Sequence, residues 1–207
     1  FEKLNFVLDD VKNKQPDFAS QYFKQKSPDE IRAIPFSKFL RDFILSQMSA
    51  QTKWINIEKN IHNGNLDRVF FGWDASKLKT QSGDQLNSDL ELINCGARPR
   101  HKQMLSLRDN IITLERVHCD YGSIGNYIIS TPIKDVLTSF TDINGKYKLD
   151  YFGVALCCEW LKNYIDIIKP DVHVKRILSP ERLNFLNGKE SDAEVVEHRR
   201  ARRCALG

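Results

Sequence analysis

Apolar residues recur every three or four positions along much of this 207-residue chain. The clearest run begins after Ser37, a residue type that favours helix N-caps. Its apolar members share one face of a helix and are Phe39, Leu40, Phe43, Ile44 and Met48. A second run ends at Asn63-Gly64, a pair that terminates helices. The pattern predicts two consecutive helices, the first of them inside the protein.

A polar stretch over residues 72–89 interrupts this pattern and predicts a loop with at most one short helix. Helical spacing returns from Arg100, where the residues that share a face are Met104, Leu107, Ile111 and Leu114. Shorter apolar runs follow at 124–129 and from Pro132 to Phe140. Because strand-like alternation is scarce, we predict an all-α fold without internal repeats.

Composition narrows the class of protein only a little. A net charge of +4 and a pI near 8.7 allow a polyanionic partner without requiring one. The five cysteines are odd in number and include the adjacent pair Cys157-Cys158, which argues against a disulfide framework and favours a reducing cytoplasm. No run approaches the roughly 18 apolar residues of a membrane span, so we expect a soluble, cytoplasmic protein. We also expect it to be a monomer.

The cysteines and histidines also lack the tight spacing of metal ligands. A zinc site built from His198 and Cys204 is conceivable, but scattered residues of these types are more often structural. We therefore expect neither a metal nor a cofactor.

The segment most informative about function joins three pieces of the chain. A short turn at 149–153 leads into an apolar, helix-like run at 154–164, and then into Lys169-Pro-Asp-Val-His-Val-Lys-Arg176. This order resembles the catalytic half of the helix-hairpin-helix DNA glycosylases: a Leu-Pro-Gly-Val-Gly-like hairpin, a helix and a Val-Asp-Thr-His-Val segment. The resemblance implies that the hairpin grips a phosphate through backbone N–H groups and that Asp171 faces the sugar of a flipped nucleotide.

Two further segments extend the resemblance over roughly residues 37–178. Ser49-Ala50-Gln51-Thr52 is similar to the Leu-Ser-x-Gln-Thr segment of endonuclease III and its relatives, which implies that Gln51 enters the space left by the extruded base. Residues 95–102 resemble the Gly-Phe-Tyr-Arg-x-Lys-Ala segment that follows, and residues 93–130 are also similar to the 3-methyladenine DNA glycosylase I branch.

The family resemblance implies a two-lobed helical fold with a central cleft. One lobe would comprise residues 37–140 and the other residues 1–36 with 141–207, and the hairpin and helix at 149–164 would border the cleft. Double-stranded DNA would be the partner. The implied contacts to its backbone are Gly153, Arg98, Arg100, Lys102, Lys175 and Arg176.

A flipped base also needs aromatic side chains on which to stack. Trp54 is the best candidate, because it lies three residues after Gln51. Other aromatic residues could contribute, although aromatic residues at helical spacing usually belong to the core. They are Phe70, Phe71, Trp73, Trp160 and Tyr164.

The sequence departs from the family pattern at the hairpin. Aligned on 149–153, Tyr151 replaces the first glycine and Gly153 is the second. An alternative register makes Gly153 the first glycine and Ala155 the second, but it is disfavoured because it puts Glu159 where the family has a small packed residue. The lysine that forms a Schiff base in bifunctional members is then Ala155, or Cys157 in the alternative register. The cysteine spacing of the endonuclease III iron–sulfur cluster is also missing. We therefore predict a monofunctional glycosylase, or else a protein that uses some other lysine.

Base excision builds positive charge on the sugar, and a carboxylate such as Asp171 can stabilise that charge and activate water. Pro170-Asp171 is also how an ordinary helix begins, and one aspartate can serve both purposes. His173 is expected to support the loop rather than to catalyse. The chain is thus predicted to excise damaged, mismatched or modified bases. The alternatives are a non-catalytic DNA-binding module of the same fold and a base-excising restriction or toxin-type enzyme.

Overall fold

The computed structural model describes residues 26–50, 52–96 and 100–167. In these ranges the chain forms eleven α-helices, one 3-10 helix and no strand, which confirms the predicted all-α fold. In chain order the α-helices are α3 (Pro28–Arg32), α4 (Phe36–Met48), α5 (Trp54–His62), α6 (Asn65–Val69), α7 (Ala75–Thr80), α8 (Gly83–Leu92), α9 (Arg100–Leu105), α10 (Leu107–Tyr121), α11 (Ile124–Ser130), α12 (Ile133–Thr141) and α13 (Val154–Leu161). The 3-10 helix η1 spans Phe71–Trp73.

Helix α4 lies inside the protein, as its apolar pattern predicts. The five apolar residues of that pattern are each at most 1% exposed. The helix begins at Phe36 with Pro35 as its N-cap residue, two residues earlier than the predicted cap at Ser37. Pro35 holds φ at −68° and has no N–H to leave unpaired, so the chain can enter the helix there without a side-chain cap.

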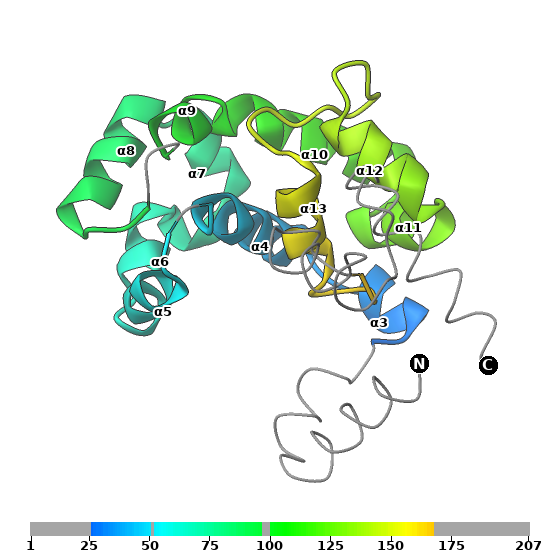
Figure 1. Ribbon diagram of the computed structural model, residues 1–207, viewed down its shortest axis with the longest axis horizontal. Coiled ribbons are helices and arrows are strands. Elements are labelled where there is room, and N and C mark those ends of the chain that lie inside the picture. The colour runs from blue at the N-terminus through cyan, green and yellow to red at the C-terminus, as the bar shows by residue number, and fades with distance from the viewer. Residues whose placement is uncertain (1–25, 51, 97–99, 168–207) are drawn as a thin grey trace, which may run out of the picture.

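The helices gather at two ends of an elongated arrangement, with α4 and α10 running between them (Figure 1). Helices α5 to α9 lie at one end, where α8 packs on α9 and α7 packs on α10. At the other end α11 packs on α3, and α12 packs on α13, which also packs on α4. The sequence analysis placed α11 and most of α12 in the lobe of residues 37–140. Both helices pack on helices outside that range, α11 on the preceding α3 and α12 on the following α13.

The polar stretch over residues 72–89 is more helical than predicted. It contains α7 and most of α8, so the expectation of one short helix at most was wrong. The Asp74 carboxylate caps α7 by accepting from two backbone N–H groups, that of Ser76 at 2.9 Å and that of Lys77 at 3.2 Å. Leu86 and Leu90, four residues apart, are buried on one face of α8. Two buried leucines thus suffice to hold a helix whose other residues are mostly polar.

Trp160 anchors α13 in the core. Its ring is fully buried and contacts Phe43 and Phe140 edge-on, with centroids 5.8 and 5.6 Å away, and it also touches Phe152. The indole Nε1 donates to the carbonyl oxygen of Phe39 at 3.1 Å. Because α13 follows directly after the turn at 149–153, this anchor fixes where that turn lies relative to α4.

Across the helices that the structure describes, none combines the length and apolarity needed to cross a membrane.

Candidate functional site

The turn at 149–153 has three exposed residues, Asp150, Tyr151 and Gly153, and two buried ones. Leu149 and Phe152 are buried, and the Leu149 N–H donates to the Phe140 carbonyl at 2.9 Å. The Tyr151 side chain is 52% exposed, and Gly153 is exposed as well. The buried pair holds the turn against the core, so its exposed residues can meet a partner.

A buried amide cluster grips this turn from behind. The Asn110 side chain pairs with both backbone polar groups of Asp150. Asn110 Oδ1 accepts from the Asp150 N–H at 2.7 Å, and Asn110 Nδ2 donates to the Asp150 carbonyl at 3.1 Å. Gln47 Nε2 donates to the same carbonyl at 3.4 Å, and Gln103 Nε2 donates to the Gln47 carbonyl at 3.0 Å. The cluster of Gln47, Gln103 and Asn110 therefore joins α4, α9 and α10 to the turn.

The two residues aligned with the family glycines, Tyr151 and Gly153, differ in backbone conformation. Tyr151 has φ +53°, in the left-handed region that glycine favours. Gly153 has φ −88° and is the N-cap residue of α13. A Cβ built on Gly153 would meet no heavy atom within 4 Å, so the second glycine leaves an open surface. The helix predicted after the turn is confirmed and begins at Val154.

Two basic residues predicted to contact DNA are only two positions apart but have different surroundings. Arg100 is engaged by the protein itself: Nε donates to Asn87 Oδ1 at 2.8 Å, Nη1 donates to the Cys95 carbonyl at 3.1 Å, and the guanidinium pairs with Glu91. Lys102 is exposed on α9, and its ammonium lies 6.0 Å from the centroid of the Tyr151 ring. Arg100 thus holds α9 to α8, whereas Lys102 borders the turn.

Trp54 is the first residue of α5 and is 49% exposed, so it is available for contact with a base. Most of the other aromatic candidates belong to the core, as expected. Those that are buried are Phe70, Trp73, Trp160 and Tyr164. Phe71 is 38% exposed. Among the described residues, the aromatic candidates exposed enough to stack on a base are therefore Trp54 and Phe71.

Several predicted site residues lie outside the described residues. They are Gln51, Arg98, Asp171, His173, Lys175 and Arg176. Ala155, at the position of the family lysine, is half-buried in the first turn of α13. The structure therefore brings together Lys102, Tyr151 and Gly153, with the end of α4 that precedes Gln51.

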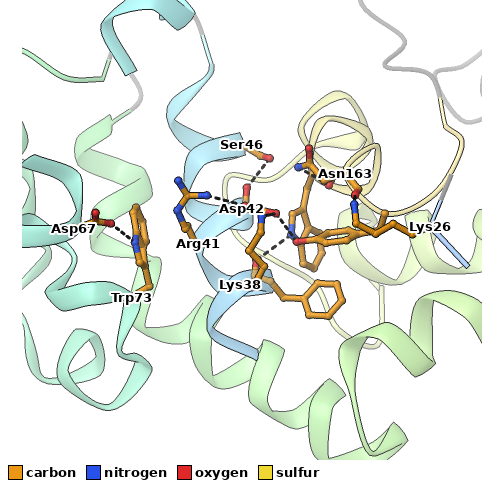
Figure 2. A network of polar contacts seen from close by, with 11 residues as sticks. Lys26, Lys38, Arg41, Asp42, Ser46, Asp67, Trp73 and Asn163 are labelled. Carbon is orange, nitrogen blue, oxygen red and sulfur yellow. Dashed lines mark hydrogen bonds and ion pairs between the residues drawn. The ribbon is translucent and has the colours of Figure 1, made fainter. Parts of the chain in front are cut away.

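A second polar cluster, which the sequence analysis missed, surrounds Asp42 in α4 (Figure 2). The Asp42 side chain is 5% exposed, and it accepts from the Tyr164 hydroxyl at 2.8 Å and pairs with Lys38 and with Arg41 at 3.5 Å. Burial and the neighbouring carboxylate raise the pKa of Tyr164, which keeps its hydroxyl protonated as a donor. Two cations and a hydroxyl contact this buried carboxylate, so its charge is compensated within the protein.

The same cluster continues toward η1. The Arg41 guanidinium lies 5.6 Å from the centroid of the Trp73 ring, and Trp73 Nε1 donates to Asp67 at 2.6 Å. These contacts connect α4 to the end of the molecule that holds α5 to α9 (Figure 2). One signal in the sequence could have revealed both clusters: the polar residues Asp42, Gln47 and Asn110 interrupt otherwise apolar helix faces.

Among the described residues, no group of three or more His, Cys, Asp or Glu side chains is arranged to hold a metal ion. The buried thiols of Cys95 and Cys157 have pKa values raised by burial, which makes them poor nucleophiles.

Comparison of the chain with protein-family models, with curated proteins and with solved structures finds no match. The functional interpretation therefore depends on the motifs and on the surroundings of the turn at 149–153.

The buried amide cluster leads to a prediction about stability. Asn110→Ala should lower the free energy of unfolding by about 1–3 kcal/mol, because it leaves the N–H of Asp150 without its partner. Urea unfolding measures this change. The control is Asn144→Ala, at an exposed loop position, which should change stability by less than about 0.5 kcal/mol. Equal stability of the two variants would show that Asn110 does not hold the turn.

Proposed function

We propose that this protein is a monofunctional DNA glycosylase that hydrolyses the N-glycosidic bond of a damaged, mismatched or modified base flipped out of double-stranded DNA. One observation carries the proposal: the buried cluster of Gln47, Gln103 and Asn110 draws together three segments that resemble parts of one family's site. These segments are the end of α4, α9 with Lys102, and the turn at 149–153.

The end of α4 matters because the chain continues from it to the proposed intercalating residue. Gln51 lies four residues after Gln47, so it can be at most about 14 Å of chain away from the cluster. Trp54 opens the next helix three residues later. Gln51 and Trp54 would thus be close enough to the turn to act on the same stretch of duplex.

The proposed chemistry relies on Asp171, which follows the end of α13 at Leu161 by ten residues. Its carboxylate would stabilise the positive charge that develops on the sugar and orient the attacking water. With Ala155 at the position of the family lysine, that position offers no amine to attack the sugar. The expected product is therefore an intact abasic site.

The proposed architecture follows from the same resemblance. One lobe would comprise residues 37–140 and the other residues 1–36 with 141–207, and the DNA-binding cleft would lie between them. The enzyme would act as a monomer in the cytoplasm, associated with the nucleoid if the source is bacterial.

A second candidate function is a DNA-binding module of this fold without catalysis. Tyr151 in the turn favours it, because a side chain replaces the glycine that usually permits close approach of a phosphate. A restriction or toxin-type enzyme would share the proposed chemistry and differ in acting on unmodified bases.

Salt dependence tests whether this surface meets DNA. If about four to six phosphates are contacted, log affinity should fall with log salt at a slope near −4 to −5. Lys102→Ala should reduce that slope by about one unit and weaken all duplexes alike. Arg100→Ala is the matched control two positions away, and it should leave the slope unchanged because that guanidinium is already engaged by Glu91 and Asn87.

Fluorescence anisotropy over a range of salt concentrations gives these slopes. A wild-type affinity that does not respond to salt would contradict the proposal. So would equal slopes for the wild type and Lys102→Ala.

A further inference from the structure

Tyr151 occupies a backbone conformation that its residue type disfavours. At φ +53° its Cβ approaches the backbone closely, a cost that glycine in this position would avoid. Because 52% of the side chain is exposed, burial offsets little of that cost. Strain of this kind at an exposed position points toward a functional role for the side chain.

The other non-glycine residues with positive φ have different surroundings. Trp73 is buried and its indole donates to Asp67, so packing stabilises it. Asn94 belongs to the residue types that tolerate this region. Phe71 is exposed, like Tyr151, and none of the cation–aromatic contacts in the described residues involves its ring. Among the described residues, Tyr151 alone combines a positive φ, an exposed side chain and a neighbouring cation.

That cation is Lys102, whose ammonium lies 6.0 Å from the Tyr151 ring centroid, at the outer limit of a cation–π contact. In the described ranges, several basic side chains pair with carboxylates, among them Lys79 with Glu115. Lys102 makes no such ion pair there. Its charge is therefore available to an anion that approaches the ring.

Both residues are carried by backbone that is tied to one buried cluster. Asp150, which precedes Tyr151, is held by Asn110. Gln103, which follows Lys102, donates to the Gln47 carbonyl. The segments that carry the ring and the ammonium are thus fixed relative to each other before any ligand arrives, which lowers the entropic cost of binding.

We propose that Tyr151 and Lys102 hold one nucleotide of the DNA strand, with the ammonium paired to its phosphate and the ring packed against the attached nucleoside. The proposal rests on the proposed function and adds to it a contact made by two side chains, where glycine would offer only backbone. The open surface at Gly153 leaves room for the strand to pass.

Binding to a short duplex that contains one tetrahydrofuran abasic-site analogue tests this contact. Tyr151→Gly should bind about tenfold more weakly than the wild type, the order of effect expected from losing one aromatic contact to a nucleoside. Tyr151→Phe keeps the ring and should bind nearly as tightly as the wild type. Ile143→Gly removes a large exposed apolar side chain from a different loop and should leave affinity unchanged.

The two residues should also act as a pair. The loss of affinity in Tyr151→Gly combined with Lys102→Ala should be smaller than the product of the two separate losses, because both residues hold the same nucleotide. Glycine suits the local backbone, so Tyr151→Gly should fold; Tyr151→Asn, which also tolerates φ above zero, provides a second variant without the ring.

The outcomes separate this contact from the proposed function. Wild-type affinity in Tyr151→Gly and Tyr151→Asn, with the wild type binding DNA, would overturn the contact and leave the proposed function standing. A loss in Tyr151→Phe as large as in Tyr151→Gly would overturn the packing of the ring. Absence of any binding by the wild type at low salt would overturn both proposals.

Discussion

Asp171→Asn should abolish base excision while leaving the affinity for duplex DNA within a few-fold of wild type. The carboxylate is proposed to act on charge that exists only in the transition state, so its loss should lower the excision rate by about 10²–10⁴-fold with little effect on ground-state binding. Single-turnover excision gives the rate, and anisotropy gives the affinity. Both measurements should use the duplex on which the wild type is most active.

The substitution also separates the two interpretations of Asp171. Asparagine caps helices about as well as aspartate, so a residue that serves only as a cap should tolerate the change. Asp150→Asn provides a matched control, because it removes the same charge at an exposed position in the turn, where only the backbone of Asp150 contacts Asn110. Excision by Asp171→Asn at the rate of Asp150→Asn would exclude catalysis by this carboxylate.

Trp160→Ala should lower the free energy of unfolding by about 3–5 kcal/mol, the usual range for removing a large aromatic side chain from a core. The indole is fully buried among Phe43, Phe140 and Phe152 and donates to the Phe39 carbonyl, so its removal leaves a cavity beneath α13. Urea unfolding followed by circular dichroism measures the change.

Trp54→Ala is the control for Trp160→Ala, because it removes the same type of side chain from a more exposed position. Because 49% of Trp54 is exposed at the start of α5, its loss should cost far less stability than the loss of Trp160. If Trp54 lines the base pocket, the variant should instead lose excision activity. Equal destabilisation by the two substitutions would contradict the assignment of Trp160 to the core and Trp54 to the surface.

The sequence predicted the helices that carry a continuous apolar face and missed those held by a few residues. Helix α4 could be predicted because five buried residues repeat at helical spacing. Helices α7 and α8 could not, because only one buried leucine in α7 and two in α8 pack them against the core in a mostly polar stretch. Their stability depends on tertiary packing, which local composition does not report.

For the site, the sequence predicted the turn and the helix after it. It could not predict that Asn110 and Gln47 would grip Asp150, because nothing in the sequence pairs residues that are 40 and 103 positions apart. Nor could it separate Lys102 from Arg100, since the ion pair of Arg100 with Glu91 depends on how α9 packs on α8.

The central claim is most directly tested by base release from a panel of duplexes that each carry one alkylated, oxidised, deaminated or unmodified base. We predict that at least one duplex yields an abasic site that stays intact until alkali is added, and that borohydride traps no covalent protein–DNA adduct. Release from an unmodified base alone would indicate the restriction or toxin-type enzyme. Binding of DNA without release of any base from the whole panel would contradict the glycosylase and leave the non-catalytic module.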